Sequence, residues 1–243
     1  MRIIAIIQAR TGSTRLPGKV LQMISGKTML ERVLERAAKT PSLERCMIAT
    51  TDKPQDDPIE NFCTKNKISF YRGSEENVLD RYYQTALSVK AGTIVRITSD
   101  CPLIDPDLIE EVIQTFQSSG ADYASNSLKL SFPRGLDTEV FSFKSLENAW
   151  KNAREDYEKV HVTPYIYRHP EKFKLHTVSS EFDYSKYRWT VDTPDDLKLV
   201  REIYSRLEHK ENFDWKDVLQ IMQSDPSLQL INDHVRQKKL EEK

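Results

Sequence analysis

The fold is decided by residues 3–21, which read IIAIIQARTGSTRLPGKVL. The first five are apolar and mostly β-branched, a pattern typical of a strand that is covered on both faces. A polar loop with Gly12, Pro17 and Gly18 follows. Apolar residues then recur at three- and four-residue spacing in KTMLERVLERAAKT, residues 27–40, which predicts an amphipathic helix. A buried strand, a loop and such a helix make the first unit of an α/β fold.

The same alternation continues outward from this unit. Further strands are expected at residues 45–51, 68–73 and 93–98, and further helices at residues 58–67, 77–90 and from Pro106, with Asp105 as its cap. About four β-α units in the first 120 residues predict a parallel sheet with helices on both faces. Ligands bind outside the carboxyl ends of such strands. The loops after Ala9, Thr51 and Thr98 should therefore share one rim.

The second half has a different pattern. Residues 121–126 and 136–143 are expected to be extended and joined through a Pro-Arg-Gly turn. The remaining expected elements are helices at 145–154 and 157–167, a strand within 173–180, a helix capped by Thr193 and opened by Pro194, and a polar helix or frayed tail at 234–243. We expect one domain over residues 1–243, with β-α units in 1–120, a more irregular region in 121–190 and C-terminal helices in 191–243.

Composition excludes several classes of protein. The chain has 36 Lys and Arg against 37 Asp and Glu, so there is no overall basic excess for nucleic-acid binding. Apolar residues make up 38% of the chain, enough to bury a core. Cys46, Cys63 and Cys101 form no paired framework, and the first apolar run is too short for a signal segment or membrane span. We therefore expect a reduced, cytoplasmic protein with no membrane or nucleic-acid partner.

The first loop carries three cations within ten residues, Arg10, Arg15 and Lys19, beside Gly12 and Ser13. Backbone and hydroxyl donors together with Arg and Lys charges are what a polyphosphate requires. The spacing fits neither a Walker A loop nor a dinucleotide fingerprint. The alternative is a solvated loop that is basic without a ligand.

Two aspartates could supply metal ligands. Asp100 follows the strand at 93–98, where it could also cap a turn, and Asp192 precedes the helix that Thr193 begins. Because Thr193 can cap that helix alone, Asp192 is free to bind Mg²⁺ with Asp100 and phosphate oxygens. Sequence spacing does not show whether Asp100 and Asp192 meet.

Seven motifs in order cover nearly the whole chain and resemble one family. They are IIQARTGSTRLPGKVL (6–21), IATTDKPQDDPIENFC (48–63), GSEENVLDRYYQTA (73–86), TSDCPLIDP (98–106), PRGLDTEVF (133–141), VHVTPYIYRHP (160–170) and VDTPDDL (191–197). The chain resembles the cytidylyltransferases that include CMP-KDO and CMP-acylneuraminate synthetases, and most closely their SpsF-type branch, named for spore-coat polysaccharide biosynthesis. The resemblance implies a Rossmann-like, three-layer α/β/α fold of the glycosyltransferase-A type, with a mainly parallel sheet and a small extended and helical excursion in the second half.

The resemblance also implies roles for individual residues. The nucleotide-binding set is Ala9, Arg10, Gly12, Ser13, Arg15, Lys19, Thr51, Asp52 and Asp100, of which Arg15, Lys19 and Asp100 would be catalytic. Asp100 and Asp192 would bind Mg²⁺. The acceptor-side set is Asp137, Glu139, His161 and Arg188. The KDO branch has a motif closer to G-D-x-P, whereas Ser99 precedes Asp100 here, which argues against KDO as the acceptor.

The resemblance implies a CTP-dependent transfer of CMP to an acidic sugar or related acceptor, with release of pyrophosphate, for a surface polysaccharide. Residues 1–120 would then be the nucleotide-binding units and residues 121–190 the acceptor-binding and possible dimerisation region. A homodimer formed through residues 136–143 is expected as well. A glycosyltransferase of the same architecture is the main alternative, although it should carry a D-x-D motif. A sugar-1-phosphate nucleotidyltransferase, with more glycine in its first loop, and a non-catalytic nucleotide-binding regulator are two others. His161 could be a core residue, and Arg134 and Arg188 could be ordinary surface arginines.

Overall fold

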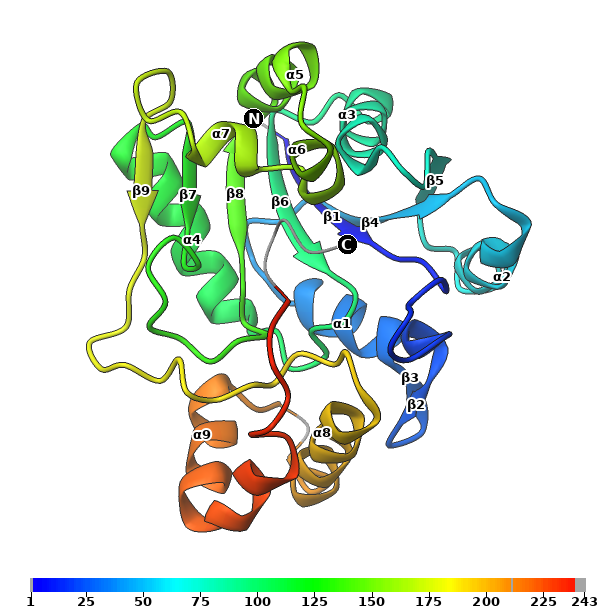
Figure 1. The fold of residues 1–243 in the computed structure, drawn as a ribbon, viewed down its shortest axis with the longest axis vertical. Coiled ribbons are helices and arrows are strands. Elements are labelled where there is room, and N and C mark those ends of the chain that lie inside the picture. Colours follow the sequence, from blue (N-terminus) through cyan, green and yellow to red (C-terminus); the bar gives the residue numbers. More distant parts are fainter. Residues whose placement is uncertain (1, 211, 239–243) are drawn as a thin grey trace.

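The computed structural model describes residues 2–210 and 212–238 and has one large sheet at its centre (Figure 1). The strands lie in the order β5-β4-β1-β6-β8-β7-β9. Their bounds are β1 Ile3–Gln8, β4 Arg45–Thr51, β5 Phe70–Gly73, β6 Thr93–Thr98, β7 Tyr123–Ser125, β8 Glu139–Ser142 and β9 Leu175–Thr177. Every neighbouring pair is parallel except the two pairs that contain β8. The predicted α/β fold with a mainly parallel sheet is confirmed.

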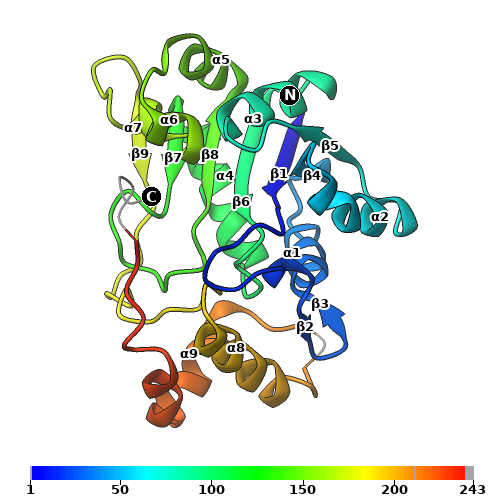
Figure 2. The ribbon, with the colours of Figure 1, turned by 45° about the vertical axis from the view of Figure 1, so that its right-hand side comes forward.

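Helices cover both faces of this sheet because its central strands are apolar on both sides. In β1, Ile3 and Ile7 pack into one core while Ile4 and Ile6 pack into the other. The first core is covered by α1 Met29–Ala37, α2 Asp57–Lys65 and α4 Pro106–Ser119, and the second by α3 Val78–Ser88, α5 Phe143–Asn152, α6 Asp156–His161 and α7 Pro164–Tyr167. Figure 2 shows the second group of helices gathered around the upper part of β6 and β8.

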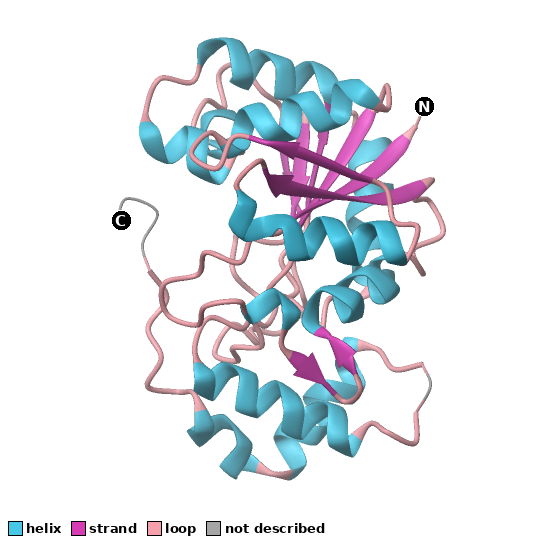
Figure 3. Cartoon of the chain, turned by 90° about the vertical axis from the view of Figure 1, so that its right-hand side faces the viewer, coloured by secondary structure: helices cyan, strands magenta, loops and turns pink. Residues whose placement is uncertain are grey.

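The C-terminal helices extend the first core beyond the edge of the sheet. These are α8 Pro194–Arg206, α9 Trp215–Ser224 and the 3-10 helix η3 Pro226–Ile231. Figure 3 shows them as a helical layer below the sheet, next to a short hairpin. That hairpin is formed by β2 Met23–Ile24 and β3 Lys27–Thr28, and β2 contacts α8. Among the described residues, no helix combines the length and apolar character needed to cross a membrane.

Several expected elements are confirmed with small shifts of their ends. Asp105 caps α4 by accepting from the backbone N–H groups of residues 107 and 108, and Thr193 caps α8. The single helix expected at 157–167 is wrong, because Val162 has a φ of 73° and the chain forms the short helices α6 and α7 instead. Residues 234–238 are not helical, and 239–243 lie outside the described residues.

A loop of the second half returns to the rim of the sheet. The N–H of Arg134 donates to the carbonyl of Tyr187 at 2.9 Å, and the N–H of Trp189 donates back to the carbonyl of Arg134 at 2.7 Å. Gly135 makes this approach possible, since its φ is 110° and a Cβ there would lie 2.6 Å from the backbone nitrogen of Thr190. The loop thereby fixes the segment that leads to Asp192.

Replacing Gly135 by alanine should therefore destabilise the protein. We expect a loss of roughly 2–4 kcal/mol in the free energy of unfolding, because the new Cβ meets backbone and the φ disfavours an L side chain. Urea denaturation followed by circular dichroism measures it. The matched control is Gly120→Ala, also at a positive φ of 60° but with only the end of a lysine side chain near the new Cβ. Equal losses in the two variants would contradict the role of the close approach.

Candidate functional site

The polar loops meet at the carboxyl ends of three parallel strands. Gln8 at the end of β1 lies in register with Ala49 in β4 and with Thr98 in β6. The loop that follows β1 is compact, because the N–H groups of Ser13 and Gly18 both donate to the carbonyl of Thr11, at 2.8 and 2.9 Å. The expected common rim is therefore formed.

Lys19 is the centre of this rim. It begins the 3-10 helix η1 Lys19–Leu21 and is 8% exposed. Its ammonium donates at 2.8 Å to Asp100 Oδ2, at 2.8 Å to Asp192 Oδ1 and at 2.8 Å to the carbonyl of Val191. Asp100 and Asp192, which lie far apart in the sequence, thus share one cation.

The charges in this cluster shift the pKa values of Asp100 and Lys19. Burial alone would raise the pKa of Asp100, but the Lys19 ammonium outweighs burial and lowers that pKa to about 2. Burial alone would lower the pKa of Lys19, but the charges of Asp100 and Asp192 outweigh it, so the pKa is raised. Both partners are therefore charged at neutral pH.

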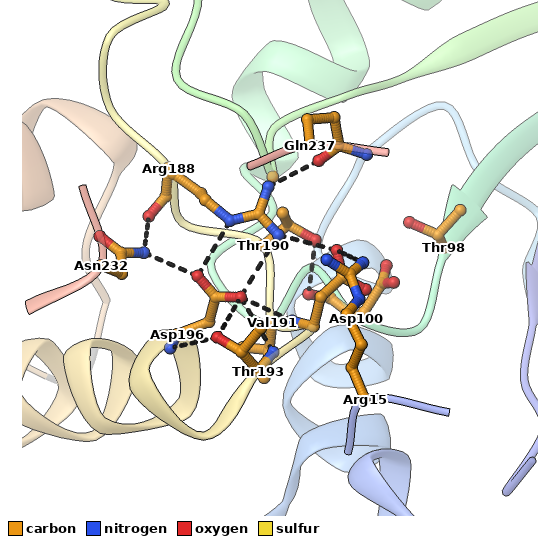
Figure 4. Close-up of polar contacts among 12 residues, drawn as sticks. Arg15, Thr98, Asp100, Arg188, Thr190, Val191, Thr193, Asp196, Asn232 and Gln237 are labelled. Carbon is orange, nitrogen blue, oxygen red and sulfur yellow. Dashed lines mark hydrogen bonds and ion pairs between the residues drawn. The ribbon is translucent and has the colours of Figure 1, made fainter. Parts of the chain in front are cut away.

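Two arginines complete the surroundings of Asp192. Its Oδ2 lies 2.9 Å from Arg15 Nη2 and 2.8 Å from Arg188 Nη2. Thr193 caps α8 through its own hydroxyl, so the carboxylate of Asp192 is not used as a helix cap. Figure 4 shows Arg15 and Arg188 coming from different parts of the chain, with Asp100 beside Arg15.

The two carboxylates have the donor chemistry of a magnesium site. Mg²⁺ is usually held by one or two carboxylates together with water and phosphate oxygens. Asp100 and Asp192 already direct one oxygen each at a single positive charge, that of Lys19. In the part of the chain that the structure describes, no group of three or more His, Cys, Asp or Glu side chains could hold a metal. The two carboxylates are the kind of oxygen donors that Mg²⁺ takes, and oxygens of a bound phosphate would have to complete its coordination.

The other residues of the predicted nucleotide-binding set lie in the first loop or next to it. Arg10 pairs with Glu75 at 3.3 Å, and the position of Gly12 faces the side chains of Gln55 and Glu75. The remaining predicted positions adjoin β4. The Ala9 N–H donates to the carbonyl of residue 49 at 3.1 Å, Asp52 N–H donates to the carbonyl of residue 73 at 2.9 Å, and Thr51 is buried.

Asp56 is a residue of this rim that sequence reasoning missed. It is completely buried and accepts from the N–H and the hydroxyl of Thr11, both at 2.7 Å, and from the hydroxyl of Thr51. It therefore fastens the basic loop to the loop after β4. In the sequence, Asp56 precedes Asp57-Pro58 and looks like a helix cap, yet its side chain makes no cap hydrogen bond. No local signal indicates its partner Thr11.

The acceptor-side residues are not all in one place. Asp137 accepts from the N–H of Gly135 at 2.9 Å and from Arg134 Nη1 at 3.4 Å, and burial raises the pKa of Asp137. It therefore lies on the loop that returns to the rim. Arg188 instead belongs to the cluster around Asp192.

Glu139 and His161 lie on the face covered by α3, α5, α6 and α7. The carboxylate of Glu139 accepts from the hydroxyls of Tyr123 at 2.6 Å and Thr163 at 2.5 Å and pairs with Arg96. Its charge is thus compensated by protein groups. His161 is the last residue of α6 and is half-buried.

Comparison with known proteins connects this geometry to one family. The family profile described as Cytidylyltransferase matches residues 4–223. An uncharacterized protein of Methanocaldococcus jannaschii is 40% identical over 245 residues, covering 100% of this chain and 99% of that protein. The spore coat polysaccharide biosynthesis protein SpsF of Bacillus subtilis is 34% identical, covering 92% of this chain and 95% of its own.

A solved structure agrees over the whole length. A cytidylyltransferase from Leptospira borgpetersenii superposes with a TM-score of 0.89 at 32% identity, covering 98% of this chain and 99% of that one. The sheet order, the flanking helices and the C-terminal helices thus belong to an architecture found in a related protein.

Proposed function

Because this chain belongs to the cytidylyltransferase family, we propose that it transfers the cytidylyl group of CTP to an acidic sugar or a related acceptor and releases pyrophosphate. Nucleotidyl transfer is the activity of the family; the acceptor and the pathway are our proposal. One observation supports it most. Lys19, Arg15, Asp100 and Asp192 converge at the rim where the basic loop leaves β1.

The chemistry follows from where charge develops. An acceptor oxygen attacks the α-phosphorus in line, the bond from that phosphorus to the oxygen bridging to the β-phosphate breaks, and pyrophosphate leaves with the electron pair. Arg15 and Lys19 offset the negative charge that grows on the leaving group. Arg10, Ser13 and the backbone at Gly12 would hold the outer phosphates in the same loop. Ala9, Thr51 and Asp52 would lie beside the nucleoside.

Asp100 and Asp192 would hold Mg²⁺ at this place. When bound, the ion supplies positive charge that neutralises the phosphates and lowers the pKa of an acceptor hydroxyl. The protein's own contribution is to aim both carboxylates at one point, and the lowered pKa of Asp100 keeps that carboxylate ionised at neutral pH.

The acceptor is proposed from two features of the chain. The motif around Asp100 departs from that of the KDO branch through Ser99 and Cys101, which favours a different acidic sugar. The similarity to SpsF supports a role in a surface polysaccharide. On the acceptor side we propose Asp137, which lies on the loop that returns to the rim. Glu139 and His161 stay acceptor-side predictions of the sequence resemblance. The homodimer and the cytoplasmic location stay predictions.

Pyrophosphate release in the presence of a panel of acceptors tests the proposal. The purified protein is incubated with Mg²⁺, each nucleoside triphosphate in turn, and either acidic sugars, neutral sugars or sugar 1-phosphates. We expect pyrophosphate only with CTP and an acidic sugar, and none after chelation by EDTA or without acceptor.

Other outcomes of that assay would favour the other functions. Pyrophosphate formed from sugar 1-phosphates, or equally from all four triphosphates, would contradict the proposal. Hydrolysis of a UDP-sugar without pyrophosphate would identify a glycosyltransferase instead.

A further inference from the structure

We propose that Arg188, Asp196 and Asn232 form a unit that positions Asp192, so that the C-terminal segment completes the active site. The inference rests on the proposed nucleotidyl transfer. It gives Arg188 the role of a positioning residue, in place of the acceptor contact that the sequence resemblance implies. We call these three residues the positioning unit.

Asp196 is the anchor of the positioning unit. It lies in the first turn of α8 and is completely buried. Its Oδ2 accepts from the backbone N–H of Asp192 at 2.9 Å, and its Oδ1 accepts from Arg188 Nε at 2.9 Å. Burial alone would raise the pKa of Asp196, but the hydrogen bonds that it accepts, that from Arg188 first, outweigh burial and lower the pKa. One carboxylate therefore holds both the backbone of Asp192 and the side chain that pairs with it.

Arg188 transmits this position to the carboxylate of Asp192. Its Nη2 donates to Asp192 Oδ2 at 2.8 Å while its Nε is held by Asp196, so the plane of the guanidinium is fixed at two points. Its Nη1 donates to Gln237 Oε1 at 2.6 Å. Figure 4 shows the guanidinium lying between Asp196 and Gln237. An arginine with this many protein partners is suited to orienting a neighbour.

Asn232 joins the C-terminal segment to this pair. It follows η3 and is 3% exposed. Its amide donates at 3.0 Å to the carbonyl of Arg188 and at 2.8 Å to Asp196 Oδ1. Asn232 makes no hydrogen bond to Asp192 itself in the described structure, so any effect on the site must pass through Arg188 and Asp196. That indirect route separates it from Arg15 and Lys19, which contact Asp192 directly.

The competing interpretation is an acceptor contact by Arg188. Arg188 also lines a pocket of about 290 Å³ that includes Arg134 and Lys186, and an acidic group could enter there. The two roles predict different changes. A positioning residue alters the Mg²⁺ requirement of CTP binding, whereas an acceptor contact alters only the KM for the acceptor.

The experiment measures CTP binding by calorimetry as a function of Mg²⁺ concentration, without any acceptor. For Asn232→Ala we expect the Mg²⁺ concentration at which half of the protein binds CTP to rise about 10-fold. Losses of metal affinity of this size are typical when a residue that orients a metal ligand is replaced. Arg188→Lys keeps the charge but loses the two-point contact, and should show the same direction of change. It also provides the test if Asn232→Ala does not fold.

A matched control separates positioning from general loosening of the C-terminal segment. Leu228, in η3, is 2% exposed and purely apolar. Leu228→Ala should lower the melting temperature but leave the Mg²⁺ dependence unchanged. A wild-type Mg²⁺ dependence in both Asn232→Ala and Arg188→Lys would overturn the inference, and a raised acceptor KM alone in Arg188→Lys would establish the acceptor role. Failure of the wild-type protein to bind CTP would instead contradict the proposed function.

Discussion

Asp100→Asn is expected to lower turnover by about 1,000-fold while the fold stays intact. The amide has the shape of the carboxylate but not its charge, so the rim loses one of the two anions suited to Mg²⁺ and phosphate neutralisation fails. Pyrophosphate release under saturating CTP measures the effect, and circular dichroism checks the fold. The control is Asp107→Asn, the same change at an exposed position in the first turn of α4. Near-normal turnover of Asp100→Asn would remove Asp100 from the catalytic site.

The same variant has a signature in the pH dependence of stability. The pKa of Asp100 is about 2 in the fold against an ordinary value of 3.8. A lowered pKa contributes stability that is fully present above the ordinary value and is lost as the pH falls toward 2. The difference in unfolding free energy between the wild type and Asp100→Asn should therefore shrink over that acidic range. Urea denaturation at pH 5 and pH 2.5 measures it.

Lys19→Ala is expected to lower kcat/KM for CTP by about 100-fold. This loss corresponds to roughly 3 kcal/mol, the upper end of what hydrogen bonds to a charged group contribute. The substitution removes the cation that faces Asp100 and Asp192 and that would meet the triphosphate. Initial rates over a range of CTP concentrations measure the loss.

Two comparisons make the result of Lys19→Ala specific. Lys27→Ala removes a lysine from β3, where it pairs with Glu35 at the surface, and should leave the rates unchanged. Lys19→Arg keeps a charge but not a compact ammonium, and should recover only part of the activity. An unchanged kcat/KM in Lys19→Ala would contradict a place for Lys19 at the triphosphate.

Local sequence patterns predict most of this fold. The runs at 3–7, 45–51 and 93–98 are apolar enough to be recognised as buried strands, and the caps at Asp105 and Thr193 are local motifs. The β2–β3 hairpin has two residues in each strand, too few to show a period. The break at Val162 depends on a positive φ that a β-branched residue rarely adopts, so nothing in its own sequence predicts it.

Part of the set of residues that reach this rim could be predicted from the sequence, but their pairing could not. The parallel-sheet rule places Lys19 and Asp100 at one rim, but Asp192 comes from a segment beyond the β-α units, and only packing shows that it meets them. The same holds for Asp56 with Thr11 and for Arg188 with Asn232. Hydrogen bonds between residues so far apart depend on the whole fold, which a pattern of neighbouring residues does not contain.

The reversed direction of β8 has a consequence for how this protein can evolve. Because β8 runs against β6, its beginning and not its end lies at the rim, and the loop over residues 126–138 enters the site outside the β-α units. Loops tolerate insertion and sequence change far better than the elements that they join. Under the proposed function, a change of acceptor would require substitutions in this one connection and could leave Lys19 and Asp100 in place.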